Sequence, residues 1–185
     1  MLLLLFGDCS CGGVNPDAVD GLVDHDNAPF SLEQATVLFA ANSANSEDRS
    51  DAFLFVGQDA TCADMLDAIE SGEGWPGDAL LFGMNQYISD PEASSLVGFQ
   101  GLWMGYAYAD GTERSLNALF FSDGMQHVLS QPYGTSSTTW LDIESTNSNQ
   151  VTGSFATPFW SGRYTAERCD SYTFGGGDTG WDTGW

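Results

Sequence analysis

The sequence predicts an all-β protein, an antiparallel β-sandwich or open barrel with one short covering helix at about residues 61–71. Short apolar or alternating runs recur along the chain between separators rich in Asp, Gly, Pro, Ser and Asn, as expected of short strands joined by turns. Clear helical spacing occurs in one segment, whereas a fold of alternating strands and helices would need several. At 185 residues the chain fits a single domain.

Two apolar runs at 35–42 and 51–58 flank the polar connector SANSEDRS, so they are expected to form a hairpin-like pair of strands. The first run is ambiguous, because Ser31 and Gln34 could form a capping box and residues 32–39 also fit a helical spacing. Further strands are expected at 79–88, 97–109, 115–121, 125–129, 138–145, 150–159 and 162–169.

Alternation assigns faces in two of these runs. In LWMGYAYA (102–109), the even-numbered residues Leu, Met, Tyr and Tyr share one face, and the odd-numbered residues share the other. In WLDIES (140–145), Leu141 and Ile143 oppose Trp140 and two acidic residues. A core face set against a wet face is typical of an antiparallel sheet.

The predicted helix begins after Thr61, a good N-cap residue, with Asp64 in its first turn. Its apolar residues lie at helical spacing, and Gly72 is placed to end it. The residues predicted to face the core are Cys62, Met65, Leu66 and Ile69.

The ends of the chain differ from the middle. Residues 1–11 are interpreted as a degenerate export or lipoprotein leader, with Cys9 where a lipidated cysteine would lie, although Asp8 departs from that pattern and translation could instead begin upstream. Residues 12–30 are interpreted as a flexible acidic arm, 31–170 as a single β domain, and 171–185, which contain the repeat DTGWDTGW, as a flexible Gly/Asp/Trp tail. The expected location is extracytoplasmic, either secreted or anchored by lipid in the cell envelope.

The four cysteines fit an oxidising compartment. Cys9 and Cys11 belong to the leader, so Cys62 and Cys169 are the natural disulfide partners. A bridge between them would close a loop of about a hundred residues, for which the chain-entropy model gives an upper figure of roughly 4–5 kcal/mol.

The charge restricts the partners. Twenty-six acidic residues stand against four arginines and no lysine, for a formal net charge of −22. Phosphate backbones and anionic membrane surfaces would be repelled, so no nucleic acid is expected as a partner. The apolar run of the leader is too short to form a transmembrane span. The sequence identifies no particular partner: a carbohydrate or a protein at the cell surface is an open alternative, and so is a lipid anchor.

Residues 138–169 resemble a known type of domain. Val151, Gly153 and Phe155 form a VxGxF motif, and a GxYxAxxC motif runs from Gly162 to Cys169. This pattern resembles the C-terminal meander of uncharacterised bacterial secreted and lipoprotein β-sandwich domains. The resemblance implies export, a β-sheet body and a cysteine bridge, with Cys62 in the place of the second cysteine. It implies no activity.

Two kinds of binding site are considered. Asp24 and Asp26, with Asp17 and Asp20 nearby, offer closely spaced oxygen ligands for calcium, the one cofactor considered, although they do not fit an EF-hand loop. Exposed aromatic rings could instead stack on sugars. The candidates for stacking are Trp103, Trp140 and Trp160, with Tyr133 and Tyr164.

No catalytic motif is found, and no catalytic residue is assigned. His25 and His127 lack motif neighbours and are interpreted as surface or structural residues. Asp142 and Glu144 form one carboxylate pair on the predicted wet face. The leading hypothesis is an exported, non-enzymatic β domain with a structural or binding role. A carbohydrate-binding module and an acid/base hydrolase are the alternatives.

Overall fold

The computed structural model describes residues 21–41, 49–71, 74–88, 99–109, 111–130 and 138–169. These residues form eleven strands and the helix α1 (Cys62–Ser71). Among them, no helix has the length and hydropathy needed to cross a membrane. The strands are β1 (Leu22–Asp24), β2 (Thr36–Ala41), β3 (Arg49–Gly57), β4 (Ala79–Ile88), β5 (Gly101–Met104), β6 (Tyr106–Ala109), β7 (Thr112–Ser122), β8 (Met125–Ser130), β9 (Trp140–Thr146), β10 (Gln150–Ala156) and β11 (Trp160–Arg168).

All strands belong to one sheet that curls into a half-barrel. The main path runs β5-β9-β10-β11-β2-β3-β4-β7-β6, while β1 pairs with β11 and β8 pairs with β7. The two ends of this path, β5 and β6, are consecutive in the chain and meet at Gly105. The Gly105 carbonyl accepts a hydrogen bond of 2.7 Å from the amide of Leu116 in β7. One bent strand therefore joins both edges of the sheet.

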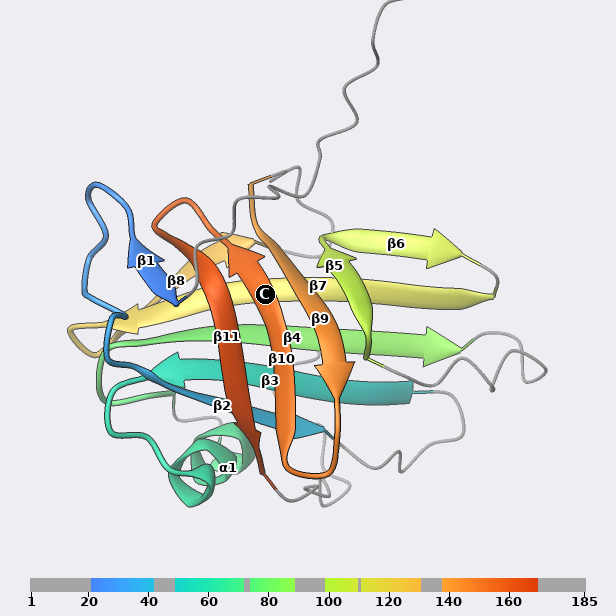
Figure 1. Cartoon of the computed structure of the whole chain (residues 1–185), viewed down its shortest axis with the longest axis horizontal. Coiled ribbons are helices and arrows are strands. Elements are labelled where there is room, and N and C mark those ends of the chain that lie inside the picture. Colours follow the sequence, from blue (N-terminus) through green and yellow to red (C-terminus); the bar gives the residue numbers. More distant parts are fainter. Residues whose placement is uncertain are drawn as a thin grey trace, which may run out of the picture.

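The main core lies between two layers of strands. Figure 1 shows β9, β10 and β11 crossing over β2, β3, β4 and β7. Rings from the two layers meet between them, with the centroids of Phe82 and Phe155 5.2 Å apart. The buried apolar residues of this core come from both layers and include Val37, Phe39, Leu54, Leu80, Leu116, Leu141, Ile143, Val151 and Ala166.

A second, smaller core lies on the outer face of β2, β3, β4 and β7, where α1 covers one end. Met65 and Ile69 of the helix are buried against it, together with Phe55 and Leu81 of the sheet. Because β2 and β3 are buried on both faces here, their sequences are continuous apolar runs and show no alternation.

The structure confirms the all-β class with one short helix and the β2–β3 hairpin. The sheet is mixed, however, because β11 pairs in parallel with β2, with Glu167 opposite Leu38. The strand expected at 97–109 is broken at Gly105. The strand expected at 150–159 ends at Ala156, because the chain turns at Thr157, whose hydroxyl accepts hydrogen bonds from the amides of Phe159 and Trp160.

The flexible arm predicted at 12–30 is corrected for residues 21–30, which belong to the folded body. β1 pairs with β11, with Leu22 opposite Gly162. Phe30 packs on Trp160, with ring centroids 4.6 Å apart, and its carbonyl accepts a 3.0 Å hydrogen bond from the indole nitrogen. β1 has only three residues and lies among turn-forming residues, so no alternation in the sequence identifies it as a strand. The leader with Cys9 and the DTGW tail lie outside the described residues.

Two motif glycines stand where the chain passes close to itself. A side-chain carbon at Gly153 would collide with the carbonyl oxygen of Asp142 on β9, and also with the hydroxyl of Tyr164. Gly162 has a φ of +144°, and a side chain there would strike the backbone at Gly21. Both positions therefore require glycine, since any Cβ would push neighbouring strands apart.

Gly153→Ala is expected to lower the free energy of unfolding by at least about 1–3 kcal/mol, because the clash forces a backbone shift within the core sheet. Gly83→Ala on β4 is the matched control, since its added carbon would meet its neighbours at ordinary contact distances of 3.5–3.8 Å. Urea denaturation of the two variants checks this. Equal stability losses in both would contradict the assigned packing.

Candidate functional site

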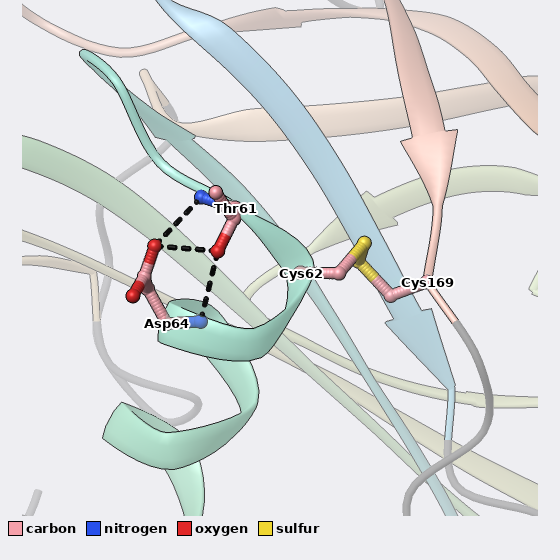
Figure 2. The surroundings of a disulfide bond; sticks show 4 residues. All are labelled: Thr61, Cys62, Asp64 and Cys169. Atoms are coloured by element: carbon pink, nitrogen blue, oxygen red, sulfur yellow. Dashed lines mark hydrogen bonds between the residues drawn. A yellow bond between two sulfur atoms is a disulfide. The ribbon is translucent and has the colours of Figure 1, made fainter.

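The start of α1 and the disulfide form one structural unit. The Thr61 hydroxyl accepts a hydrogen bond of 3.3 Å from the Asp64 amide, and the Asp64 carboxylate accepts one of 3.1 Å from the Thr61 amide. This reciprocal cap fixes the first turn of the helix. Figure 2 shows that Cys62 points from this turn toward Cys169, just past the end of β11. The sulfur atoms lie 2.00 Å apart, so the predicted pair is joined as a disulfide.

Two of the three tryptophans predicted to stack on a ligand are core residues instead. Trp103 is 1% exposed and Trp160 is 0% exposed. Both indole nitrogens donate to backbone carbonyls, from Trp103 to Phe99 and from Trp160 to Phe30. Tyr164 is also buried, and Tyr133 lies outside the described residues. Of the three candidate tryptophans, which all lie in the described ranges, only Trp140 keeps a partly exposed side chain, so these three do not form a stacking platform.

Polar residues also occupy the inner face of the sheet near Trp103. The guanidinium of Arg114 lies 5.0 Å from the centre of the Trp103 ring, and burial lowers the pKa of Arg114. Gln86 stands opposite Arg114 in the register and is 1% exposed. Within the described part of the chain, neither polar atom of the Gln86 side chain has a hydrogen-bond partner. The Trp103 ring therefore makes a cation–π contact with Arg114 inside the protein and is not available to stack on a ligand.

The predicted calcium ligands do not come together. The Asp24 carboxylate accepts a hydrogen bond of 2.8 Å from the Leu32 amide, and Asp26 is exposed. In the described ranges, no three His, Cys, Asp or Glu side chains gather in a way that could hold a metal ion. Asp17 and Asp20 lie outside those ranges. Each histidine contacts a neighbouring strand: His25 hydrogen-bonds to Ser161 of β11 at 2.8 Å, and the His127 ring stacks on that of Phe120 of β7, with centroids 4.6 Å apart.

The carboxylate pair Asp142 and Glu144 lies on the outer side of β9, and the two side chains have unlike environments. Glu144 forms an ion pair with Arg163 of β11. Both residues of this ion pair line a surface hollow, whereas Asp142 is not among its lining residues. Desolvation, followed by repulsion from Glu144, raises the pKa of Asp142. The two carboxylates therefore do not face each other across a cleft, which a glycosidase would require.

The raised pKa of Asp142 has a consequence for stability. An acid whose pKa is higher in the folded state opposes folding once it is ionised, so the cost is absent below the unfolded-state pKa of about 3.9 and present at neutral pH. Asp142→Asn is therefore expected to stabilise the protein at pH 7, by less than about 1 kcal/mol because the group is only partly buried and solvent screens its charge. The gain should vanish near pH 3.

Urea denaturation at both pH values measures this effect. Glu144→Gln is the matched comparison, since it removes the ion pair with Arg163 and should be neutral or slightly destabilising at pH 7. A gain for Asp142→Asn that is equal at pH 3 and pH 7 would contradict the electrostatic origin.

Three exposed tyrosines gather on the outer face of the sheet. Tyr106 and Tyr108 of β6 stand opposite Ser115 and Glu113 of β7, and Glu113 also stands opposite Tyr87 of β4. Directly opposed residues project from the same face of a sheet, so Glu113 lies between two rings. The tyrosines are 46% (Tyr87), 43% (Tyr106) and 60% (Tyr108) exposed. We call these five residues the tyrosine face.

The tyrosine face lies at the end of β4 and β7 that α1 does not cover. Outer residues near one end of β4 and β7, such as Leu81 and Phe121, are buried in the second core beneath the helix. Toward the other end, the same alternation reaches Tyr87 and Glu113, beyond the second core. Leu102 and Met104 of β5 continue the exposed apolar surface past the bend at Gly105.

The sequence pattern does not identify these tyrosines as a site, although it contains a signal for them. The alternation in LWMGYAYA correctly separated the even-numbered residues from Trp103. It did not say which set faces solvent, because both sets contain large apolar side chains. Tyr87 could be joined to the group only through the pairing of β4, β7 and β6.

These features define a class: a disulfide-bonded all-β domain with a half-barrel sheet, one covering helix and an exposed tyrosine face. No protein-family model, curated protein or solved structure matches this chain.

Proposed function

We propose that this protein is an exported domain of the periplasm or cell surface, with a non-enzymatic binding role. The observation that carries the proposal is the bond between Cys62 and Cys169. Disulfides persist in oxidising compartments and are rare in the cytosol of mesophiles. The net charge of −22 suits a domain that must stay soluble outside the cell, and the resemblance of residues 138–169 to secreted domains points the same way.

The binding role is supported by the tyrosine face. Tyr87, Tyr106 and Tyr108 keep about half of their surface exposed on neighbouring strands. Clustered exposed rings, each with a polar tip, are typical of recognition surfaces. A hydrolase is less well supported, because Glu144 is neutralised by Arg163 and does not face Asp142 across the hollow.

Intact mass and thiol labelling of the natively expressed protein test the proposal. The full chain, with the sequence upstream of it in its gene, is expressed in a bacterial host and fractionated. We expect the protein outside the cytoplasm, with Cys62 and Cys169 labelled only after reduction. A diacylglycerol adduct on Cys9 would establish a lipid anchor. An unprocessed cytoplasmic chain with free thiols at both positions would overturn the proposal.

A further inference from the structure

We propose that the tyrosine face binds a neutral polysaccharide chain, with sugar rings stacked on Tyr87, Tyr106 and Tyr108. This inference rests on the proposed binding function and names the ligand class of the same surface. It uses tyrosines in place of the tryptophans, two of which are buried.

The layout of the rings suits an extended, flat ligand. Tyr106 and Tyr108 are two residues apart on one strand, a separation of about 7 Å. Tyr108 and Tyr87 are two strands apart, roughly 10 Å across the sheet. The three rings thus rise from a broad patch of antiparallel sheet and do not enclose a pocket. A chain molecule lying on the sheet could contact all three.

Polar side chains next to the tyrosine rings can form hydrogen bonds with the hydroxyls of a sugar. Glu113 lies between Tyr87 and Tyr108, and Ser115 lies between Tyr106 and Asn85. A sugar ring has apolar faces formed by C–H groups and an edge of hydroxyls, so it needs flat apolar surfaces next to polar side chains. Aromatic rings beside carboxylate, amide and hydroxyl groups meet both needs.

The negative charge of the protein helps to decide which class of macromolecule binds to the tyrosine face. The net charge of −22 and the carboxylate of Glu113 within the face disfavour anionic polymers. Tyrosine is also common at protein interfaces, but charged residues are depleted at their centre, whereas Glu113 lies between two of the rings here. A neutral polysaccharide carries no charge to be repelled, and its hydroxyls can donate to Glu113. Neutral glycans therefore fit this surface better than the alternatives.

Affinity gel electrophoresis of the full chain tests the proposal. The gels contain one neutral polysaccharide each: hydroxyethyl-cellulose, xylan, galactomannan or dextran. Carboxymethyl-cellulose is the anionic match to hydroxyethyl-cellulose. We expect at least one neutral polysaccharide to retard the wild-type protein. Tyr106→Ala with Tyr108→Ala should weaken that binding at least tenfold, while the unfolding temperature changes little.

The control variant is Met125→Ala with Val128→Ala. These side chains are 59% and 48% exposed on β8, which pairs with the other half of β7. The control should bind like the wild type. Absence of retardation in every neutral gel would overturn the proposal, as would equal binding by the tyrosine variant or stronger retardation by the anionic polymer. Loss of self-association in the tyrosine variant, without any glycan binding, would make the face a protein interface and also overturn it.

The two proposals can fail separately. Thiol labelling and fractionation report on export whatever the ligand is. Failure of glycan binding by a correctly exported, disulfide-bonded protein would overturn the ligand class alone.

Discussion

Replacing both bridged cysteines, as Cys62→Ala with Cys169→Ala, is expected to lower the free energy of unfolding by about 2–5 kcal/mol. The two residues are 107 positions apart, so the bond removes much of the freedom of the unfolded chain. It also ties the first turn of α1 to the end of β11, while Met65 and Ile69 are the helix residues buried against the sheet. Urea denaturation of the oxidised wild type and the double variant measures the loss.

Reduction is the internal control for this experiment. A reducing agent should lower the stability of the wild type toward that of the double variant, and it should leave the double variant unchanged. If the oxidised wild type and the variant unfolded at the same urea concentration, the bridge would contribute nothing, and the helix would be held by packing alone.

Trp160→Ala is expected to lower the free energy of unfolding by about 3–5 kcal/mol. The side chain is fully buried in the main core, where it contacts Phe30 and Phe120 with ring centroids 4.6 and 5.5 Å away. Its removal would leave a large cavity and deprive the Phe30 carbonyl of its hydrogen-bond donor. Thermal or urea unfolding followed by circular dichroism checks the prediction.

Two further variants separate packing from surface effects. Trp160→Phe keeps part of the ring packing but loses the hydrogen bond, so its stability should lie between those of the wild type and Trp160→Ala. Trp140→Ala removes a partly exposed indole and should cost less, about 1 kcal/mol. Equal losses at positions 140 and 160 would contradict the assignment of Trp160 to the core.

The fold class and the helix could be predicted because their signals are local. The sequence marks Thr61 as an N-cap with Asp64 in the first turn, and in the structure reciprocal hydrogen bonds join these two residues. The parallel pairing of β11 with β2 could not be predicted, since Glu167 and Leu38 are far apart in the chain and no turn connects the strands. The same holds for β1, whose place in the sheet depends on its pairing with β11, a strand far away in the sequence.

The site was harder to predict than the fold. Tryptophan and tyrosine are both amphipathic, so composition does not decide which rings are buried. Alternation places Trp103 and Tyr106 on opposite faces of the sheet, but which of these faces is the inner one depends on the path of β5 and β6, a bent strand that passes from one layer to the other. That path depends on Gly105 and on pairing with both β9 and β7. Three-dimensional register, which no single run of residues contains, therefore determines which rings form the tyrosine face.

The position of β11 between β10 and β2 affects how fast the protein can fold. Its residues come last among the strands, yet they complete the pairing of β2, which comes second. The edge of β2 thus stays open until nearly the whole domain has been synthesised, and contacts of such long sequence separation form slowly. We expect folding in the millisecond-to-second range, after chain completion. An incomplete chain would present an unpaired strand edge, the kind of surface on which aggregation begins.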